Sequence, residues 1–197
     1  MVTTGTSRAM ARRARPVRPV RLLLLSGALT ALMLVSFAGA GAAGARAATF
    51  AGFCDFSGAI EHQPPLTNEL TYTTFHGMFK GTCSGELTDR SGDTRQLVGA
   101  PFRYEGQGAG YLQCLGGDAT GSGSLVFGET TIDFSLSEHR RAPLDVVTLE
   151  GAAGGSALVV GNLSLETDLV KASERCSGSG LPRIEGDGRL TTAGISG

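Results

Sequence analysis

Apolar and polar residues alternate most regularly in the segment from Thr130 to Arg140. A period of two residues is typical of a β-strand with one face buried and the other exposed to solvent. On one face of such a strand lie the apolar residues Ile132, Phe134 and Leu136. On the other face lie the polar residues Asp133, Ser135 and Ser137. We therefore predict a half-buried strand in this segment.

Further segments rich in Thr, Val, Leu and Phe have the composition of short strands. They cover residues 48–60, 70–81, 95–106, 110–115, 122–127, 145–151, 155–166 and 188–195. Turn-forming residues, mostly Gly, Pro, Asp and Ser, separate them at roughly ten-residue intervals. Many short strands with regular turns predict an all-β fold, an antiparallel barrel or sandwich of about 8–10 short strands.

Glycine is frequent along the whole chain, with 30 residues in 197, of which five precede residue 48. Because each interior glycine costs a helix about 1 kcal/mol relative to alanine, this density argues against long helices. Only residues 165–175 have a helical pattern, and this segment is short. Glycines inside the predicted strands are typical of bulges and tight bends, which a curled sheet needs.

The first 47 residues have the three parts of a secretory signal peptide. Arginines without any acidic residue come first, an apolar run covers residues 22–37, and small residues follow. The sequence Ala45-Arg46-Ala47 fits the A-x-A cleavage pattern, so we expect cleavage after Ala47. Residues 48–197 would then form a single secreted domain. The alternative is an uncleaved membrane anchor, and translation could start at Met1 or at Met10.

Removal of this signal peptide changes the charge of the chain. Seven of the 17 basic residues and none of the 18 acidic residues lie in it, so the mature domain has a net charge of −8. A negatively charged surface repels phosphate backbones, and we therefore expect no nucleic-acid partner. The same charge favours solubility outside the cell.

The mature domain contains all four cysteines of the chain. An even number of cysteines in an exported chain predicts two disulfides, for which three pairings are possible. We favour Cys54–Cys83 together with Cys114–Cys176, because neighbouring segments of a meander lie close in space. Loop closure by these two bridges would stabilise the fold by about 3.6 and 4.3 kcal/mol. No C-x-x-C pair is present, which argues against a zinc site.

No motif in the chain predicts a catalytic residue, a metal site or a cofactor. The three histidines have no partner at the spacing of metal ligands and are expected in strands or at the surface: His62, His76 and His139. Gly123 and Gly128 have the spacing of a phosphate-binding loop, but Glu129 stands where that loop needs lysine. The acidic segment 89–93 lacks the calcium-loop pattern and reads as a hairpin tip.

One glycine-rich segment, residues 176–188, could present side chains to a partner. Its central residues would form an extended loop held at one end by a disulfide: Leu181, Pro182, Arg183 and Ile184. A loop that is ordered before binding loses less entropy on binding, as in many secreted protease inhibitors. The alternative is a plain surface connection.

These observations favour a secreted, non-enzymatic protein that binds a small ligand inside the barrel or an extracellular protein at its loops. A ligand cavity would be lined by residues such as Phe102, Phe127, Phe134 and Leu163. The alternative is a secreted hydrolase, which requires a cleft that joins a histidine to a carboxylate. A structural role in the cell envelope, with no pocket, is the third hypothesis.

Overall fold

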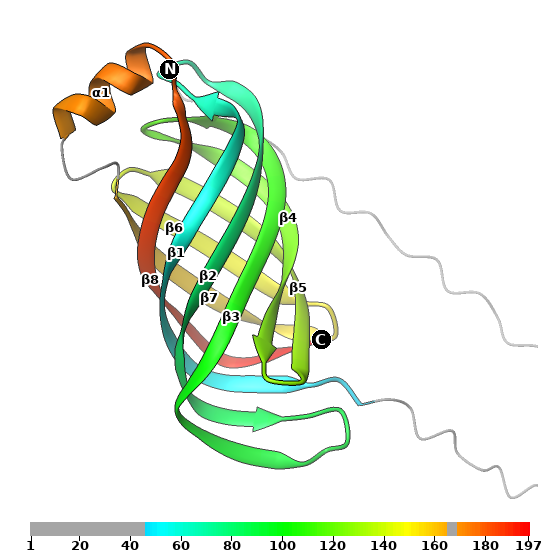
Figure 1. Cartoon of the computed structure of the whole chain (residues 1–197). Coiled ribbons are helices and arrows are strands. Elements are labelled where there is room, and N and C mark those ends of the chain that lie inside the picture. The colour runs from blue at the N-terminus through cyan, green and yellow to red at the C-terminus, as the bar shows by residue number, and fades with distance from the viewer. Residues whose placement is uncertain (1–45, 165–168) are drawn as a thin grey trace, which may run out of the picture. The chain divides into compact units, whose positions relative to one another are not determined.

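The computed structural model describes residues 46–164 and 169–197. These residues form a closed barrel of eight antiparallel strands in chain order, in which the last strand pairs with the first (Figure 1). The prediction of an all-β fold is confirmed, and the structure is a barrel rather than a sandwich. Closure leaves no free sheet edge along the paired strands, so it removes sites at which further chains could add.

The strands of the barrel are longer than the predicted short segments, because several glycines lie inside continuous strands. Their bounds are β1 (Thr49–Leu66), β2 (Thr71–Thr88), β3 (Thr94–Gln113), β4 (Gly116–Phe127), β5 (Thr130–Arg141), β6 (Leu144–Gly151), β7 (Gly154–Ser164) and β8 (Leu181–Ser196). The helix α1 (Leu169–Ser177) lies between β7 and β8 and overlaps the predicted helical segment. The proposed signal peptide lies almost entirely outside the described residues, which contain no helix long and apolar enough to cross a membrane.

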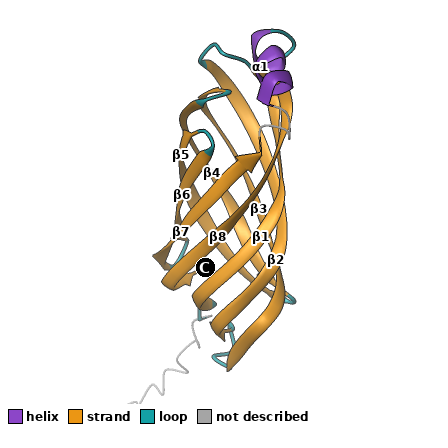
Figure 2. Ribbon diagram, turned by 90° about the vertical axis from the view of Figure 1, so that its left-hand side faces the viewer, coloured by secondary structure: helices purple, strands orange, loops and turns teal. Residues whose placement is uncertain are grey.

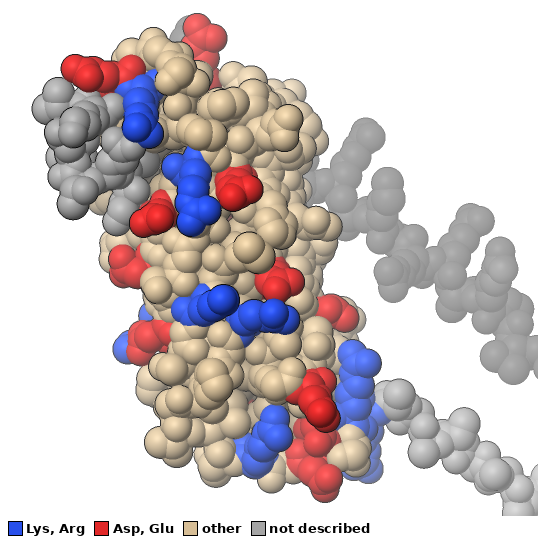
Figure 3. All heavy atoms as spheres, in the orientation of Figure 1, with Lys and Arg blue, Asp and Glu red and all other residues tan. Residues whose placement is uncertain are grey.

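The two ends of the barrel differ. One end carries α1 and the β1–β2, β3–β4 and β5–β6 turns, and we call it the helix end (Figure 2). The opposite end carries the β2–β3, β4–β5 and β6–β7 turns. On the outer face drawn in Figure 3, acidic and basic side chains are interspersed and form no patch of one sign.

Aromatic rings fill much of the barrel interior. Phe50 and Phe127 lie toward the opposite end, with ring centroids 4.9 Å apart. Phe127 stacks on Phe102 at 5.9 Å, and Phe102 contacts Phe56 edge-on at 6.4 Å. Phe56 in turn stacks on Tyr104 at 6.1 Å. The rings therefore form a continuous series of contacts, and the hydroxyl of Tyr104 marks its polar end.

Inward-facing glycines make room for these rings. Phe134 on β5 lies directly opposite Gly123 on β4, and a Cβ atom on Gly123 would lie 2.6 Å from the edge of that ring. Phe75 on β2 lies opposite Gly108 on β3 in the same way, with a distance of 2.7 Å. Both distances are below van der Waals contact. At both positions glycine leaves room for a ring, and an added Cβ would also meet a backbone carbonyl oxygen of the neighbouring strand, that of Glu105 at Gly123 and that of Thr120 at Gly108.

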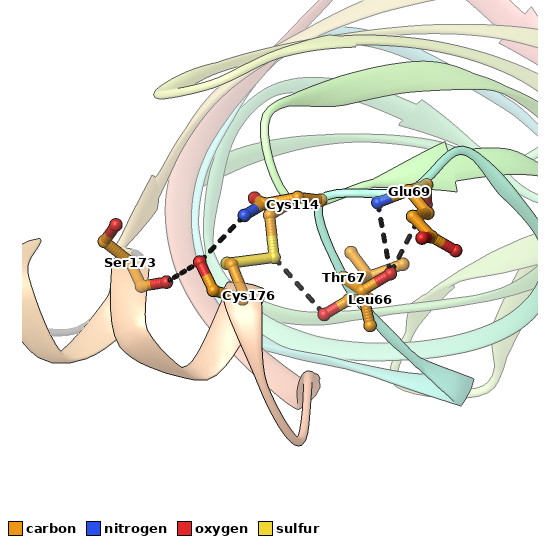
Figure 4. The surroundings of a disulfide bond; sticks show 8 residues. Leu66, Thr67, Glu69, Cys114, Ser173 and Cys176 are labelled. Carbon is orange, nitrogen blue, oxygen red and sulfur yellow. Dashed lines mark hydrogen bonds between the residues drawn. A yellow bond between two sulfur atoms is a disulfide. The ribbon is translucent and has the colours of Figure 1, made fainter.

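Both predicted disulfides are present, and the favoured pairing is confirmed. Cys54 and Cys83 lie opposite each other on the paired strands β1 and β2. Cys114, in the β3–β4 turn, is bonded to Cys176 of α1 (Figure 4). The Cys114 amide donates a hydrogen bond to the Thr67 carbonyl at 2.7 Å, and the Asn68 amide donates to the Cys176 carbonyl at 3.0 Å. The second disulfide therefore joins α1 to the β3–β4 turn, and the hydrogen bonds join both to the β1–β2 turn.

Candidate functional site

Charged side chains lie inside the barrel near the helix end. The alternation of β5 continues past its apolar residues, so that Glu138 and Arg140 also point inward, with exposed fractions of 3% and 0%. Asp145 on β6 lies opposite Arg140 in the sheet, and it is 5% exposed. His62 on β1 is buried to the same extent. We call these four residues the polar cluster.

Arg140 is the centre of the polar cluster. Its Nη2 atom lies 2.6 Å from Oε1 of Glu138, and its Nη1 atom lies 3.2 Å from Nε2 of His62. A guanidinium has only donors, so His62 accepts this bond at Nε2, and the proton of a neutral imidazole lies on Nδ1. Burial and the positive charge of Arg140 together lower the pKa of His62 to about 3, and burial is the larger cause. His62 is therefore neutral at physiological pH.

The pKa of the Asp145 carboxyl group is raised. Burial, the larger cause, and the nearby Glu138 together raise its pKa to about 7, while Arg140 acts against the rise. Tyr104 lies close enough to both carboxyls that they, together with burial, raise the pKa of its phenol well above the usual value. Tyr104 therefore stays protonated at physiological pH, whereas Asp145 titrates near neutrality.

Several atoms of the polar cluster lack a hydrogen-bond partner. Among the described residues these include Oδ1 of Asp145, Nδ1 of His62 and Nε of Arg140. Buried polar atoms are nearly always paired in proteins, with protein groups or with ordered water. Unpaired atoms beside a cavity therefore identify a place where a bound molecule can supply the missing partners.

A cavity of about 40 Å³ adjoins the two carboxyl groups. Its walls are mainly apolar and aromatic, with contributions from Phe75, Phe79, Leu136, Val147, Val159 and Leu163. It is bounded also by four glycines on four strands: Gly77, Gly106, Gly161 and Gly186. The paired residues Asn162 on β7 and Asp187 on β8 border it too. A mainly apolar space with a few convergent polar groups is typical of a ligand site.

The predicted cavity lining is correct for only one residue. Leu163 borders the cavity, whereas Phe102, Phe127 and Phe134 do not. These three rings are buried and stack on other rings, Phe102 on Phe127 and Phe134 on Tyr104. Sequence alternation predicts that a side chain points inward, but it does not show whether neighbouring rings fill the space.

The segment proposed for partner binding is not a loop. Residues Leu181 to Ile184 form the first part of β8, and Leu181 and Ile184 are each only 2% exposed. Their apolar side chains belong to the core of the helix end. Only Pro182 and Arg183 are exposed, so a partner could contact only these two of the four predicted residues. A binding role for the segment stays a prediction.

Neither His139 nor His62 forms a catalytic cleft of the predicted kind, whereas His76 borders a surface hollow that is also lined by Glu61, Glu185 and Asp187. Nδ1 of His139 lies 2.7 Å from Oδ1 of Asp118, but both side chains are exposed on the outer surface. His62 reaches the carboxyl groups only through Arg140, does not border the cavity, and has too low a pKa to act as a base near neutrality. No group of three potential metal ligands occurs among the described residues.

The polar cluster was not predicted, although part of it follows the alternating pattern of the sequence. Glu138 and Arg140 follow Ile132, Phe134 and Leu136 at intervals of two, which places all five on one face of the strand. Asp145 precedes Val147 and Leu149 at the same interval, and His62 follows Ile60. Only barrel closure shows that β1 faces β5 and that these side chains meet.

The two perturbed groups predict opposite effects of pH on stability. Asp145 has a pKa raised from 3.8 to about 7, so its contribution falls as pH rises through this window. His62 has a pKa lowered from 6.5 to about 3, so its contribution falls as pH decreases through that window. Between about pH 4 and pH 6.5 the two slopes oppose each other, each at about 1.4 kcal/mol per pH unit.

Single substitutions should separate these slopes. We expect Asp145→Asn to become more stable as pH rises from 4.5 to 6, and His62→Gln to become less stable over the same range. Urea unfolding of both variants and of the wild type at the two pH values measures the effect, and the wild type should lie between them. Parallel pH profiles for the two variants would contradict the assigned protonation states.

Comparison of the chain with protein-family models, with curated proteins and with solved structures finds no match.

Proposed function

We propose that this is a secreted binding protein and that its ligand is a small molecule held in the barrel cavity. The apolar walls would surround the body of the ligand, and its polar group would meet Glu138 and Asp145. The observation that carries the proposal is the unpaired Oδ1 of Asp145, a buried atom at the edge of a mainly apolar cavity. Such convergence of perturbed polar groups and apolar surface favours a binding site.

The size of the cavity limits the ligand. A water molecule needs about 10–15 Å³ of such cavity volume, so a cavity of about 40 Å³ accommodates about three non-hydrogen atoms. A longer molecule would place only its polar end beside Asp145. The remainder would need neighbouring strands to move apart, because β7 and β8 are paired at Asn162 and Asp187.

Secretion is supported by two independent features. The first is the signal-peptide pattern before residue 48, and the second is the pair of disulfides, which persist in oxidising compartments. A ligand that enters the barrel would therefore be bound outside the cytosol.

A cavity-filling substitution tests this proposal. Gly161 on β7 borders the cavity. The atoms nearest to an added Cβ would be the backbone carbonyl oxygen of Asp187, at 3.3 Å, and that of Asp145, at 4.0 Å. Gly161→Ala should therefore fold and reduce the free volume. Gly194→Ala is the matched control, because an added Cβ at Gly194 on β8 would have no atom within 4 Å, and Gly194 does not border the cavity.

Two measurements apply to the wild type and both variants. Native mass spectrometry of protein purified from culture medium detects a co-purified molecule, and titration with ethanol, followed by methyl NMR shifts of Leu163 and Val147, detects a small probe. We expect both signals in the wild type and in Gly194→Ala, and their loss in Gly161→Ala. Equal signals in all three proteins, or none in the wild type, would contradict binding in this cavity.

A further inference from the structure

We propose that the ligand carries a single positive charge, as a protonated primary amine, and that this group binds between Glu138 and Asp145. This inference rests on the proposed function, and it assigns the chemical class of the ligand. It follows from the charges that border the cavity, from the unpaired atoms there and from the aromatic rings in its walls.

Every charged residue that borders the cavity is acidic. Glu138 on β5 and Asp145 on β6 are buried, Asp187 on β8 is exposed, and no described lysine or arginine borders the cavity. Arg140 does not border the cavity, but its Nη2 atom lies 2.6 Å from Oε1 of Glu138. One cation thus faces two buried carboxyl groups. A buried ionised carboxylate is strongly unfavourable without a partner, so one positive charge is missing when both are ionised.

The protein meets this deficit with a proton when the cavity is empty. Burial and the neighbouring Glu138 raise the pKa of Asp145 to about 7, so that the group is largely neutral in weakly acidic solution. The other titratable groups nearby supply no positive charge to the two carboxyls, because His62 on β1 is neutral and the phenol of Tyr104 on β3 stays protonated. An ammonium group would replace this proton, and Asp145 would ionise as the ligand binds.

The hydrogen-bonding groups also match a primary ammonium. Oδ1 of Asp145 has no partner when both carboxyls are ionised, and its side chain is only 5% exposed. The hydrogen bond between the carboxyls of Asp145 and Glu138 exists only while one of them is protonated. An ammonium group has three donors and no acceptor, so it can satisfy this oxygen and leave no acceptor of its own unpaired. The rings of Phe75, Phe79 and Tyr104 border the same cavity, and aromatic faces attract cations. A carboxylate ligand would instead face two acids and would be repelled.

Three small probes that each carry one methyl group distinguish the possible polar groups: ethylammonium, ethanol and the slightly larger acetate. Calorimetric titration at pH 8 should give at least tenfold tighter binding of ethylammonium than of ethanol, and no binding of acetate. Below pH 7 the ammonium competes with the proton on Asp145. Its affinity should therefore fall by up to tenfold per pH unit between pH 7 and pH 5, while the affinity of ethanol changes little.

Variants separate this inference from the proposed function. Asp145→Asn should weaken ethylammonium binding and abolish its pH dependence while it retains ethanol, and Gly161→Ala should weaken both. The pH dependence in the wild type tests the inference even if Asp145→Asn does not fold. Ethanol binding that equals or exceeds ethylammonium binding, or any acetate binding in the cavity, would overturn the cationic ligand and leave the cavity site intact. Absence of binding by all three probes would overturn both.

Discussion

Replacement of Arg140 by methionine is expected to lower the free energy of unfolding by about 3–5 kcal/mol at neutral pH. Arg140 is completely buried and is the only cation in contact with Glu138 among the described residues. Methionine has a similar length and would retain much of the packing, but it would leave the Glu138 carboxylate without a counter-charge in the barrel interior. Removal of one partner of a buried ion pair is far more costly than replacement of both.

The same substitution at the surface provides the control. Arg189 on β8 forms two hydrogen bonds to Asp55 on β1, at 2.7 and 2.9 Å, but both side chains are exposed. Exposed ion pairs contribute little, so Arg189→Met should leave the urea midpoint nearly unchanged. Urea unfolding followed by circular dichroism compares the two variants with the wild type. Similar midpoints for both variants would show that burial of the polar cluster is not what makes Arg140 important.

Removal of the disulfide between Cys114 and Cys176 should cost about 4 kcal/mol, from the loop-closure entropy of its 62-residue separation. It should also release α1, because a helix of nine residues is too short to be stable without tertiary contacts. In Cys114→Ala/Cys176→Ala we therefore expect a lower urea midpoint and the loss of hydrogen-exchange protection in α1, while the central strands stay protected.

The other disulfide is a matched control for the helix. Cys54 and Cys83 are 29 residues apart on strands that already pair with each other, so Cys54→Ala/Cys83→Ala should lose about 3.6 kcal/mol of stability. Exchange from α1 should not change in this variant. Retained protection of α1 after removal of Cys114 and Cys176 would show that other contacts hold the helix in place.

The predictions that succeeded depend on local or nearly local patterns. The strand that begins at Thr130 was predicted from the alternation of apolar and polar residues, and β5 covers this segment. The disulfide pairing follows from the tendency of neighbouring segments to lie close together, and a meander barrel has this property. Helix α1 contains no glycine and a single β-branched residue, Val170.

The predictions that failed concern what lies opposite a residue inside the barrel. The sequence around Leu181 and Ile184 is compatible with a loop and with a strand. Only the pairing of β8 with β1 shows that both side chains are buried. Phe102 and Phe127 point inward as expected, yet each fills the space beside the other. Neither outcome can be read from the spacing of residues along the chain.

The amino-acid sequence by itself determined that this chain forms antiparallel strands, which faces of the best-patterned strand are buried, and which cysteines are bonded. Only the tertiary structure decided that the strands close into a barrel and that Arg140 meets His62 and Glu138 inside it. The reason is physical: strand formation depends on side-chain alternation within a few residues. The pKa of Asp145 and the shape of the cavity depend instead on burial and on charges contributed by strands distant in sequence.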